Sequence, residues 1–146
     1  MAIKKRGNHH YGEKQTGIRE ELLRYSRLND YVADHFADAV CKCGSKLFQL
    51  TLDENAGAAV RICVACRNEH PIGDSDEYLE DAELGQCACP CGKEVFEITV
   101  GVSLYEDSAD VKWIYLGCRC PSCGLTATYG DWKNEFIGYE RLLSKI

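Results

Sequence analysis

The sequence predicts a small α+β protein in which two short antiparallel sheets follow one another along the chain and a helix flanks them at each end. Three observations support this prediction. Ten cysteines stand in paired clusters, two stretches alternate apolar and polar residues around a turn, and a segment near each end carries apolar residues at helical spacing. A chain of 146 residues divided into such units has small cores, which usually need a metal or a disulfide for stability.

The first 38 residues are predicted to be a basic arm and an amphipathic helix. Residues 1–15 are polar and rich in Gly, His and Lys, so we expect them to be mobile unless a partner orders them. Thr16 can cap a helix, because the apolar residues that follow it recur on one face. We expect this helix to dock on the chain's own sheets, and residues 31–39 to form a second short turn. The apolar residues of the helix are Ile18, Leu22, Tyr25 and Leu28.

Residues 39–80 are predicted to be the first metal-binding module, ending in an acidic linker. A Cys-x-Cys-Gly turn begins at Cys41, and two strands over residues 47–52 and 58–62 connect it to a Cys-x-x-Cys turn. Six acidic side chains then crowd residues 74–83. We interpret this stretch as a solvated linker or short exposed helix, with a surface for a cation or a basic partner as the alternative.

Residues 81–146 are predicted to be a second, larger module with a helix at its end. Residues 95–105 alternate strictly, and after a turn the chain returns over residues 111–116, which indicates a long antiparallel hairpin. Residues 125–129 are predicted to be a third strand. From Trp132 to Ile146 the apolar residues are spaced along one helical face, so we predict a C-terminal helix.

Alignment of the sequence with itself shows that the two modules are copies of one another. The only change in length is nine residues, and it falls inside the hairpin, where it disturbs neither cysteine turn. Duplication is the simplest account of this repeat. The matched residues are Cys41, Cys43, Gly44, Phe48 and Thr51 with Cys89, Cys91, Gly92, Phe96 and Thr99, and Cys63, Cys66, Gly73 and Asp74 with Cys120, Cys123, Gly130 and Asp131.

Eight of the ten cysteines are predicted to be metal ligands in two sets of four. The first ten residues lack the apolar run of a secretory signal and no stretch approaches a membrane span, so we expect a soluble, cytoplasmic protein with no membrane partner. Thiols stay reduced there, so clustered cysteines indicate metal, with a disulfide framework as the alternative. We expect two structural zinc ions, although four thiolates can also hold iron. The sets are Cys41, Cys43, Cys63 and Cys66, and Cys89, Cys91, Cys120 and Cys123.

Each module has Cys-x-Cys-Gly, a hairpin and Cys-x-x-Cys in that order, and in this it resembles a zinc ribbon. The resemblance covers residues 39–132 and concerns architecture, so it identifies no single protein. It implies two cysteine knuckles at the end of each sheet. The predicted fold is then a small α+β metal-bound protein, with two tandem antiparallel zinc-ribbon-like sheets between an N-terminal and a C-terminal helix. The first knuckle departs from the pattern, because one residue separates its cysteines where zinc ribbons usually have two.

Cys87 and Cys118 have no counterpart in the repeat, where Ala39 and Arg61 occupy the matching positions. Each of these two cysteines lies two residues before a predicted ligand, and on extended backbone it points the same way as that ligand. Three interpretations stay open: small apolar residues, a reversible thiol pair or disulfide, and alternative ligands that displace Cys89 or Cys120.

The sequence favours a non-enzymatic protein-interaction module stabilised by zinc. Four thiolates close the shell of each metal, and the chain has no phosphate-binding glycine loop, no His-Glu-x-x-His pattern and no nucleophile elbow. The acidic stretch suits a basic partner protein. Nucleic-acid binding through the basic N-terminal arm is the alternative, although a net charge of -6 and a pI near 5.2 disfavour it. A thiol redox or metal-handling protein that uses the two spare cysteines is the second alternative.

Overall fold

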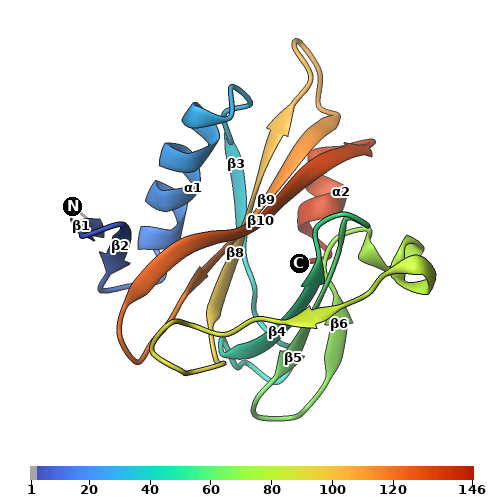
Figure 1. The fold of residues 1–146 in the computed structure, drawn as a ribbon. Helices are drawn as coiled ribbons and strands as arrows, with labels where there is room; N and C mark the ends of the chain where they lie inside the picture. Colours follow the sequence, from blue (N-terminus) through green and yellow to red (C-terminus); the bar gives the residue numbers. More distant parts are fainter. Residues whose placement is uncertain (1–2) are drawn as a thin grey trace.

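The computed structural model describes residues 3–146, which form two curled antiparallel sheets, two α-helices and two short 3-10 turns (Figure 1). The larger sheet has the strand order β1-β2-β10-β9-β8-β3, and the smaller sheet has the order β6-β5-β4-β7. Neither helix has the length and apolar character needed to cross a lipid bilayer. The strands are β1 (Ile3–Arg6), β2 (His9–Gly12), β3 (His35–Asp38), β4 (Phe48–Asp53), β5 (Ala58–Cys63), β6 (Glu69–Pro71), β7 (Gly85–Gln86), β8 (Glu97–Leu104), β9 (Val111–Arg119) and β10 (Leu125–Phe136), the helices are α1 (Gly17–Leu28) and α2 (Tyr139–Leu143), and the 3-10 turns are η1 (Ser75–Glu77) and η2 (Leu79–Asp81).

The two sheets are not clearly tandem, because each recruits strands from outside its expected module. Strand β7 comes from the expected second module but pairs with β4 of the first. The N-terminal strands all belong to the larger sheet, where β2 pairs with β10 and β3 with β8. An isolated bridge between Phe48 and Phe96 joins the two sheets. The division into residues 1–38, 39–80 and 81–146 stays a prediction, and strand pairing connects all three ranges.

Helix α1 packs on the larger sheet with its apolar stripe inward. Ile18 and Leu22 are fully buried, and they lie over Gly117 of β9. A Cβ at position 117 would lie 2.5 Å from Cγ2 of Ile18, so this glycine lets the helix approach the sheet closely. The ends of the helix differ from the predicted pattern. Thr16 stands at the N-cap without a side-chain capping bond, and the side chain of Leu28 is exposed.

Residues 3–12 form a hairpin, so the mobile arm expected there from composition is wrong, and the same expectation for residues 1 and 2 lies outside the described residues. Strand β1 pairs with β2 from Ile3 opposite Gly12 to Arg6 opposite His9, and β2 extends the larger sheet by pairing with the start of β10. Residues 35–38, expected within a short turn, form β3 and pair with β8. Composition reports local tendency, whereas β2 and β3 pair with strands far along the chain.

The C-terminal segment continues β10 before it becomes a short helix, so the helix expected over residues 132–146 is mostly wrong. Strand β10 runs through Phe136, with Trp132 and Asn134 buried and Lys133 and Glu135 exposed, which is strand periodicity. Gly138, at φ +81, ends the extended stretch, and α2 follows for five residues. The early part of this segment fits a helical stripe and a strand face equally well.

One core lies between the two sheets and ends at the cysteine turns. Phe48 and Leu50 of β4, Phe96 just before β8, and Ile98 of β8 are fully buried in it. Strand β8 is buried along both faces. Its alternating sequence predicts one apolar face and one solvent-facing face, and α1 covers the second. One cysteine of each turn belongs to this core, which ties the position of the sulfurs to the packing of the hairpins. These four cysteines are Cys41, Cys63, Cys89 and Cys120.

Candidate metal centres

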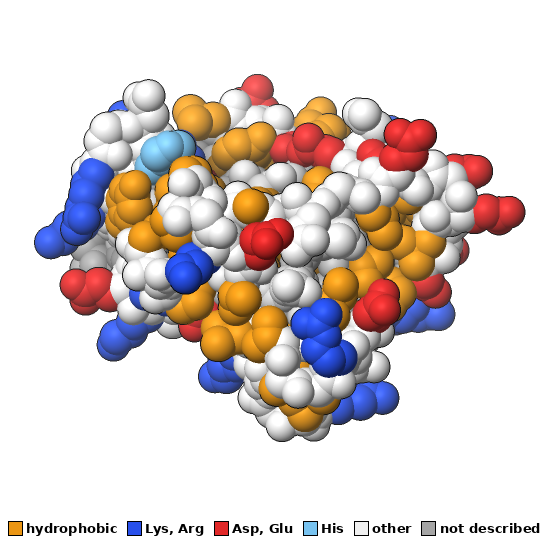
Figure 2. Space-filling view, turned by 60° about the horizontal axis from the view of Figure 1, so that its bottom comes forward, with side chains coloured by type: hydrophobic (Ala, Val, Ile, Leu, Met, Phe, Trp, Pro, Cys, Tyr) orange, Lys and Arg blue, Asp and Glu red, His pale blue; other side chains and the backbone are white. Residues whose placement is uncertain are grey.

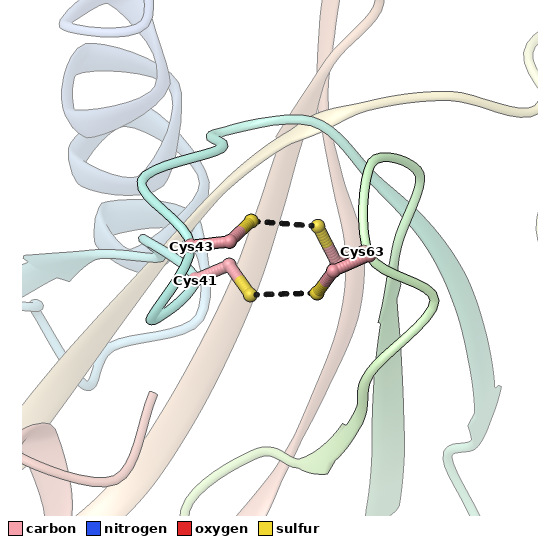
Figure 3. Close-up of side chains that lie close together, drawn as sticks. Cys41, Cys43 and Cys63 are labelled. Carbon is pink, nitrogen blue, oxygen red and sulfur yellow. Dashed lines mark hydrogen bonds between the residues drawn. The ribbon is translucent and has the colours of Figure 1, made fainter.

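The eight predicted cysteine ligands come together in two groups of four. In the first group all four sulfurs lie within 4.8 Å of one another. The Sγ atoms are 3.5 Å apart between Cys41 and Cys66 and 3.6 Å apart between Cys43 and Cys63. Figure 3 shows the side chains of Cys41, Cys43 and Cys63 pointing toward a common centre from two loops. Two of the four cysteines are buried and two are exposed, so the group lies where the core meets the surface.

The second group has the same arrangement at the end of the longer hairpin. The Sγ atoms are 3.5 Å apart between Cys89 and Cys123 and 3.7 Å apart between Cys91 and Cys120. Cys89 and Cys120 are buried, and Cys91 and Cys123 are exposed, which repeats the order of burial in the first group. The two groups are therefore compatible with duplicated zinc-binding knuckles.

Both groups are shaped by the same backbone hydrogen bonds. Gly44 and Gly92 each donate their N–H to the carbonyl of the first cysteine of their turn at 2.8 Å, and each has φ +94, a conformation that favours glycine. In the second turns, Arg67 and Gly124 donate in the same way from left-handed conformations. The single residue between the cysteines of each first turn is thus accommodated in a closed, hydrogen-bonded loop.

The turns also direct backbone N–H groups at sulfur atoms. The hydrogen bond from the backbone N–H of Cys66 contributes most to lowering the pKa of the Cys63 thiol, which is about 6. In the second group, the N–H of Lys93 has the same effect on Cys91 and lowers its pKa to about 7. Burial raises the pKa of Cys89 in the second group, whereas the lowered thiols of Cys63 and Cys91 are more readily present as the thiolate that binds metal.

The geometry of both groups fits a tetrahedral ion held by four thiolates. Zinc–sulfur bonds of about 2.3 Å place neighbouring sulfurs of a tetrahedron about 3.8 Å apart. The close sulfur pairs of the two groups, at 3.5 to 3.7 Å, are near this value. Four thiolates complete the shell and leave no position for water, which is the arrangement of a structural site. The two groups therefore suggest zinc binding in a structural role.

A buried arginine accompanies the first group. Arg61 is 4% exposed, its Nη2 donates to the carbonyl of Ile146 at 2.9 Å, and its Nε and Nη1 have no hydrogen-bond partner. The guanidinium carbon lies 4.6 Å from the centre of the Phe48 ring. Burial lowers the pKa of Arg61, and the charge of nearby Cys41 opposes this effect. Zinc with four thiolates carries a net charge of about -2, so a buried cation with unused donors fits a metal-loaded group.

The two remaining cysteines are free thiols near the second group. Burial raises the pKa of Cys87 to about 11. Burial also raises the pKa of Cys118, which is fully buried, and the proximity of Cys87 adds to this effect. Neither sulfur belongs to either group of four, and the two are not joined by a disulfide. Of the three interpretations, small apolar residues therefore fit the structure best.

Sequence reasoning missed Arg61, although the repeat contains a pattern that points to it. Arg61 takes the place that Cys118 has in the second module, on the strand that leads into the second cysteine turn. A charge at an inward position of such a strand requires a partner, and the nearby thiolates supply one. No family model, curated protein or solved structure matches this chain, so the assignment of the two groups rests on their own residues and geometry.

Proposed function

We propose that the protein is a non-enzymatic interaction module in which two structural zinc ions hold the fold that presents an acidic surface to a basic partner protein. The observation that carries this proposal is the closure of both cysteine groups. A closed group gives a substrate no position on the metal, so its contribution is to folding. The function is then expected on another part of the surface.

The acidic surface is formed by η1, η2 and the residues after them. Tyr78 and Leu84 stand among its charges with 47% and 39% of their surface exposed, so the surface offers apolar contact as well as charge. Figure 2 shows acidic side chains gathered on the side of the molecule where Figure 1 places η1 and η2. A field of one sign steers partners of the opposite sign and suppresses others. The exposed acidic residues are Asp76, Glu77, Glu80, Asp81 and Glu83.

This surface is attached to the core at its N-terminal end, which supports a role in recognition. Asp74 is buried, and both of its carboxylate oxygens accept hydrogen bonds from Nδ2 of Asn134 at 3.0 Å. The hydroxyl of Ser75 accepts the N–H of Ala59 at 2.9 Å and donates to the carbonyl of Ile72 at 2.6 Å. A surface held in place loses less conformational entropy when a partner binds. The expectation of a simple solvated linker therefore omits these anchors.

Photo-crosslinking in cells that produce the protein tests the interaction. A photo-reactive amino acid at Glu80 is expected to capture proteins through basic segments, and added salt in an extract should reduce the yield. The same amino acid at Arg27, which is exposed on α1, is the control and should capture little. Capture from position 27 alone, or capture of acidic proteins at position 80, would contradict the proposal.

The structural role of zinc is tested separately on the purified protein. Native mass spectrometry in reducing buffer is expected to show two zinc ions, one for each group. A chelator that removes them should unfold the protein, because the binding energy of a structural zinc is folding energy. A metal-free protein that keeps its fold would contradict this part of the proposal.

Nucleic-acid binding is the second candidate, and one observation favours it. A hollow of about 600 Å³ beside the second cysteine group is lined by Lys4, Arg6 and Tyr11 of the N-terminal hairpin. The guanidinium carbon of Arg6 lies 5.3 Å from the centre of the Tyr11 ring, and basic groups next to an aromatic ring suit single-stranded nucleic acid. Two facts count against nucleic-acid binding. Glu13 adds a negative charge to the same hollow, and Arg119 is already paired with Glu97 at 2.7 Å.

Binding of a single-stranded oligonucleotide measured against salt separates this candidate from the first. If it holds, affinity should fall steeply with salt and should be lost in the double variant Lys4→Ala, Arg6→Ala. Binding that is absent at low salt would exclude this candidate.

A further inference from the structure

Strand β7 is the terminal strand of the smaller sheet, and no strand of the described chain lies beside its outer edge (Figure 1). Gln86 of β7 lies opposite Thr51 of β4. The next residue, Cys87, donates its N–H to the carbonyl of Leu50 at 2.9 Å. Because bonds to a neighbouring antiparallel strand fall on alternate residues, the N–H and C=O of Gln86 point away from β4. This edge therefore offers both backbone groups that another strand needs.

The outer edge of β7 is open to solvent and fixed in position. Every residue from 83 to 86 is exposed, and the outward groups of Gln86 have no hydrogen-bond partner in the described part of the chain. The N–H of Glu83 donates to Oδ2 of Asp53 at 2.9 Å and holds the start of the strand, while the bond from Cys87 holds its end. An edge that is already ordered loses less conformational entropy when a peptide binds.

The other terminal strands of the two sheets suit a basic peptide less well. The side chains of β1 at residues 4–6 are themselves lysine and arginine, which would repel it. Strand β6 ends at Pro71, which has no N–H to donate. On β3, the carboxylate of Asp38 is already paired with Arg19 at 3.5 Å and accepts from Oγ1 of Thr99 at 2.7 Å. Of the four terminal strands in the described chain, β7 is the one that a basic strand fits best.

Acidic side chains without partners stand beside this edge. Glu80, Asp81 and Glu83 are exposed, and none of them is paired with a lysine or arginine of the described chain. Leu84 lies between Glu83 and the paired part of the strand, with 39% of its surface exposed. Oppositely charged residues on neighbouring strands attract one another, and successive side chains point to opposite faces. The edge is therefore suited to a peptide in which basic and apolar residues alternate.

We propose that the outer edge of β7 binds an extended, basic segment of the partner protein as an added strand. The segment shares with Gln86 the pair of backbone hydrogen bonds that neighbouring strands exchange, and it places a basic side chain beside Glu83 and an apolar one beside Leu84. Addition of a strand to an exposed sheet edge is a common mode of peptide recognition, in which backbone bonds supply affinity and side chains supply specificity. This inference rests on the proposed function, since it states where and how the basic partner is held.

Amide hydrogen exchange of the zinc-loaded full chain, resolved by nuclear magnetic resonance, tests the proposal. Two blocked peptides are compared, Thr-Lys-Val-Lys-Val-Thr and its matched acidic form Thr-Glu-Val-Glu-Val-Thr. The amide of Gln86 points to solvent, so it should exchange fast in the free protein and more slowly once the basic peptide is bound. The amide of Cys87, already bonded to Leu50, is the internal control, and its rate should change far less. The acidic peptide should change neither rate.

A third peptide separates strand addition from attraction between charges. It is the basic peptide with N-methyl groups on its inner residues, so it keeps both lysines but cannot donate backbone hydrogen bonds from these residues. Its affinity is expected to be about 3- to 10-fold lower than that of the unmodified basic peptide, the usual effect of one lost hydrogen bond. Because only the peptide is changed, this comparison does not depend on the folding of a variant.

Matched variants of the protein test the same contacts. Gln86→Pro removes the outward N–H, and proline is tolerated where the N–H of an edge strand faces solvent, so affinity should fall about 3- to 10-fold. Gln86→Ala keeps this N–H and should stay within about twofold of wild type. Glu83→Gln should weaken binding about 2- to 5-fold, whereas Glu106→Gln, in the turn between β8 and β9, should leave it unchanged. Zinc content and circular dichroism confirm that each variant is folded.

Each outcome bears on the proposal in a defined way. Unchanged exchange at Gln86 with millimolar basic peptide, equal affinity of the N-methylated and unmodified peptides, equal affinity of Gln86→Pro and Gln86→Ala, or equal binding of the acidic peptide overturns it. Crosslinking at Glu80 without protection of Gln86 overturns strand addition but leaves the acidic surface as the interaction surface. Conversely, protection of Gln86 by the basic peptide together with failed crosslinking at Glu80 retains the peptide site and rejects the proposed function.

Discussion

Replacing Arg61 with Met should weaken metal binding at the first cysteine group and leave the second group unchanged. Arg61 is 4% exposed beside Cys41, whereas the matching position of the second group holds the uncharged Cys118. Methionine keeps an unbranched apolar side chain but removes the charge. Burial lowers the pKa of Arg61 and attraction to the Cys41 thiolate opposes this effect, so removing the charge removes an attraction at the first group. Loss of such an outer partner usually lowers metal affinity about 10- to 100-fold, or about 1.4 to 2.7 kcal/mol.

Competition with a chelator, followed by native mass spectrometry and thiol alkylation, measures this effect for each group. Alkylation of Cys43 and Cys66 reports opening of the first group, because both are exposed once the metal leaves. Arg67→Met is the matched control, since Arg67 is exposed in the same group and its guanidinium bonds to Gln49 at 3.4 Å. The reasoning is refuted if Arg61→Met opens both groups at the same chelator concentration, or if its first group opens no earlier than in wild type.

Three further predictions concern ligands, packing and pH. Cys91→Ser should lower the zinc content from two ions to one, whereas Cys87→Ser should leave it at two, and native mass spectrometry distinguishes these results. Gly117→Ala should lower the free energy of unfolding in urea by about 1–3 kcal/mol, because the added Cβ would lie 2.5 Å from Cγ2 of Ile18; unchanged stability would contradict the close packing of α1. Burial and then the hydrogen bond to Asp131 raise the pKa of Tyr25 to about 12. The folded protein therefore keeps a proton that the unfolded chain loses above about pH 10, so wild type should lose stability relative to Tyr25→Phe between about pH 10 and 12, and a constant difference would contradict this.

The cysteine groups could be predicted from sequence because their determinants are local. Each turn consists of a few neighbouring residues, and glycines such as Gly44 and Gly92 mark the conformation that closes it. The repeat then shows which turns belong together, since Cys63 and Cys120 follow hairpins that alternate visibly. The strands of both hairpins were predictable for the same reason, and the pairing of β4 with β5 and of β8 with β9 confirms them.

The remaining pairings depend on partners that no local pattern identifies. The hairpin of β1 and β2 is polar and short, and its place in the fold comes from the bonds between β2 and the start of β10. Trp132 was assigned to a helix because its neighbours have helical spacing, but pairing with Ile114 holds it in β10. Arg61, Trp132 and Asn134 could not be identified from local patterns either. Their unpaired polar atoms become apparent only when distant segments are placed side by side.

The pairing of the first residues with the last strands has a consequence for the order in which a nascent chain can fold. The cysteines of the first group lie within residues 41–66, so this group can take up metal while the rest of the chain is still being synthesised. Helix α1 leaves the ribosome earlier but must wait for Gly117, over which Ile18 is buried. During that interval its apolar stripe is open to chaperones, and a chain arrested before β9 is expected to aggregate even with its first metal bound. Metal uptake and completion of the sheet are thus separate events in the life of the polypeptide.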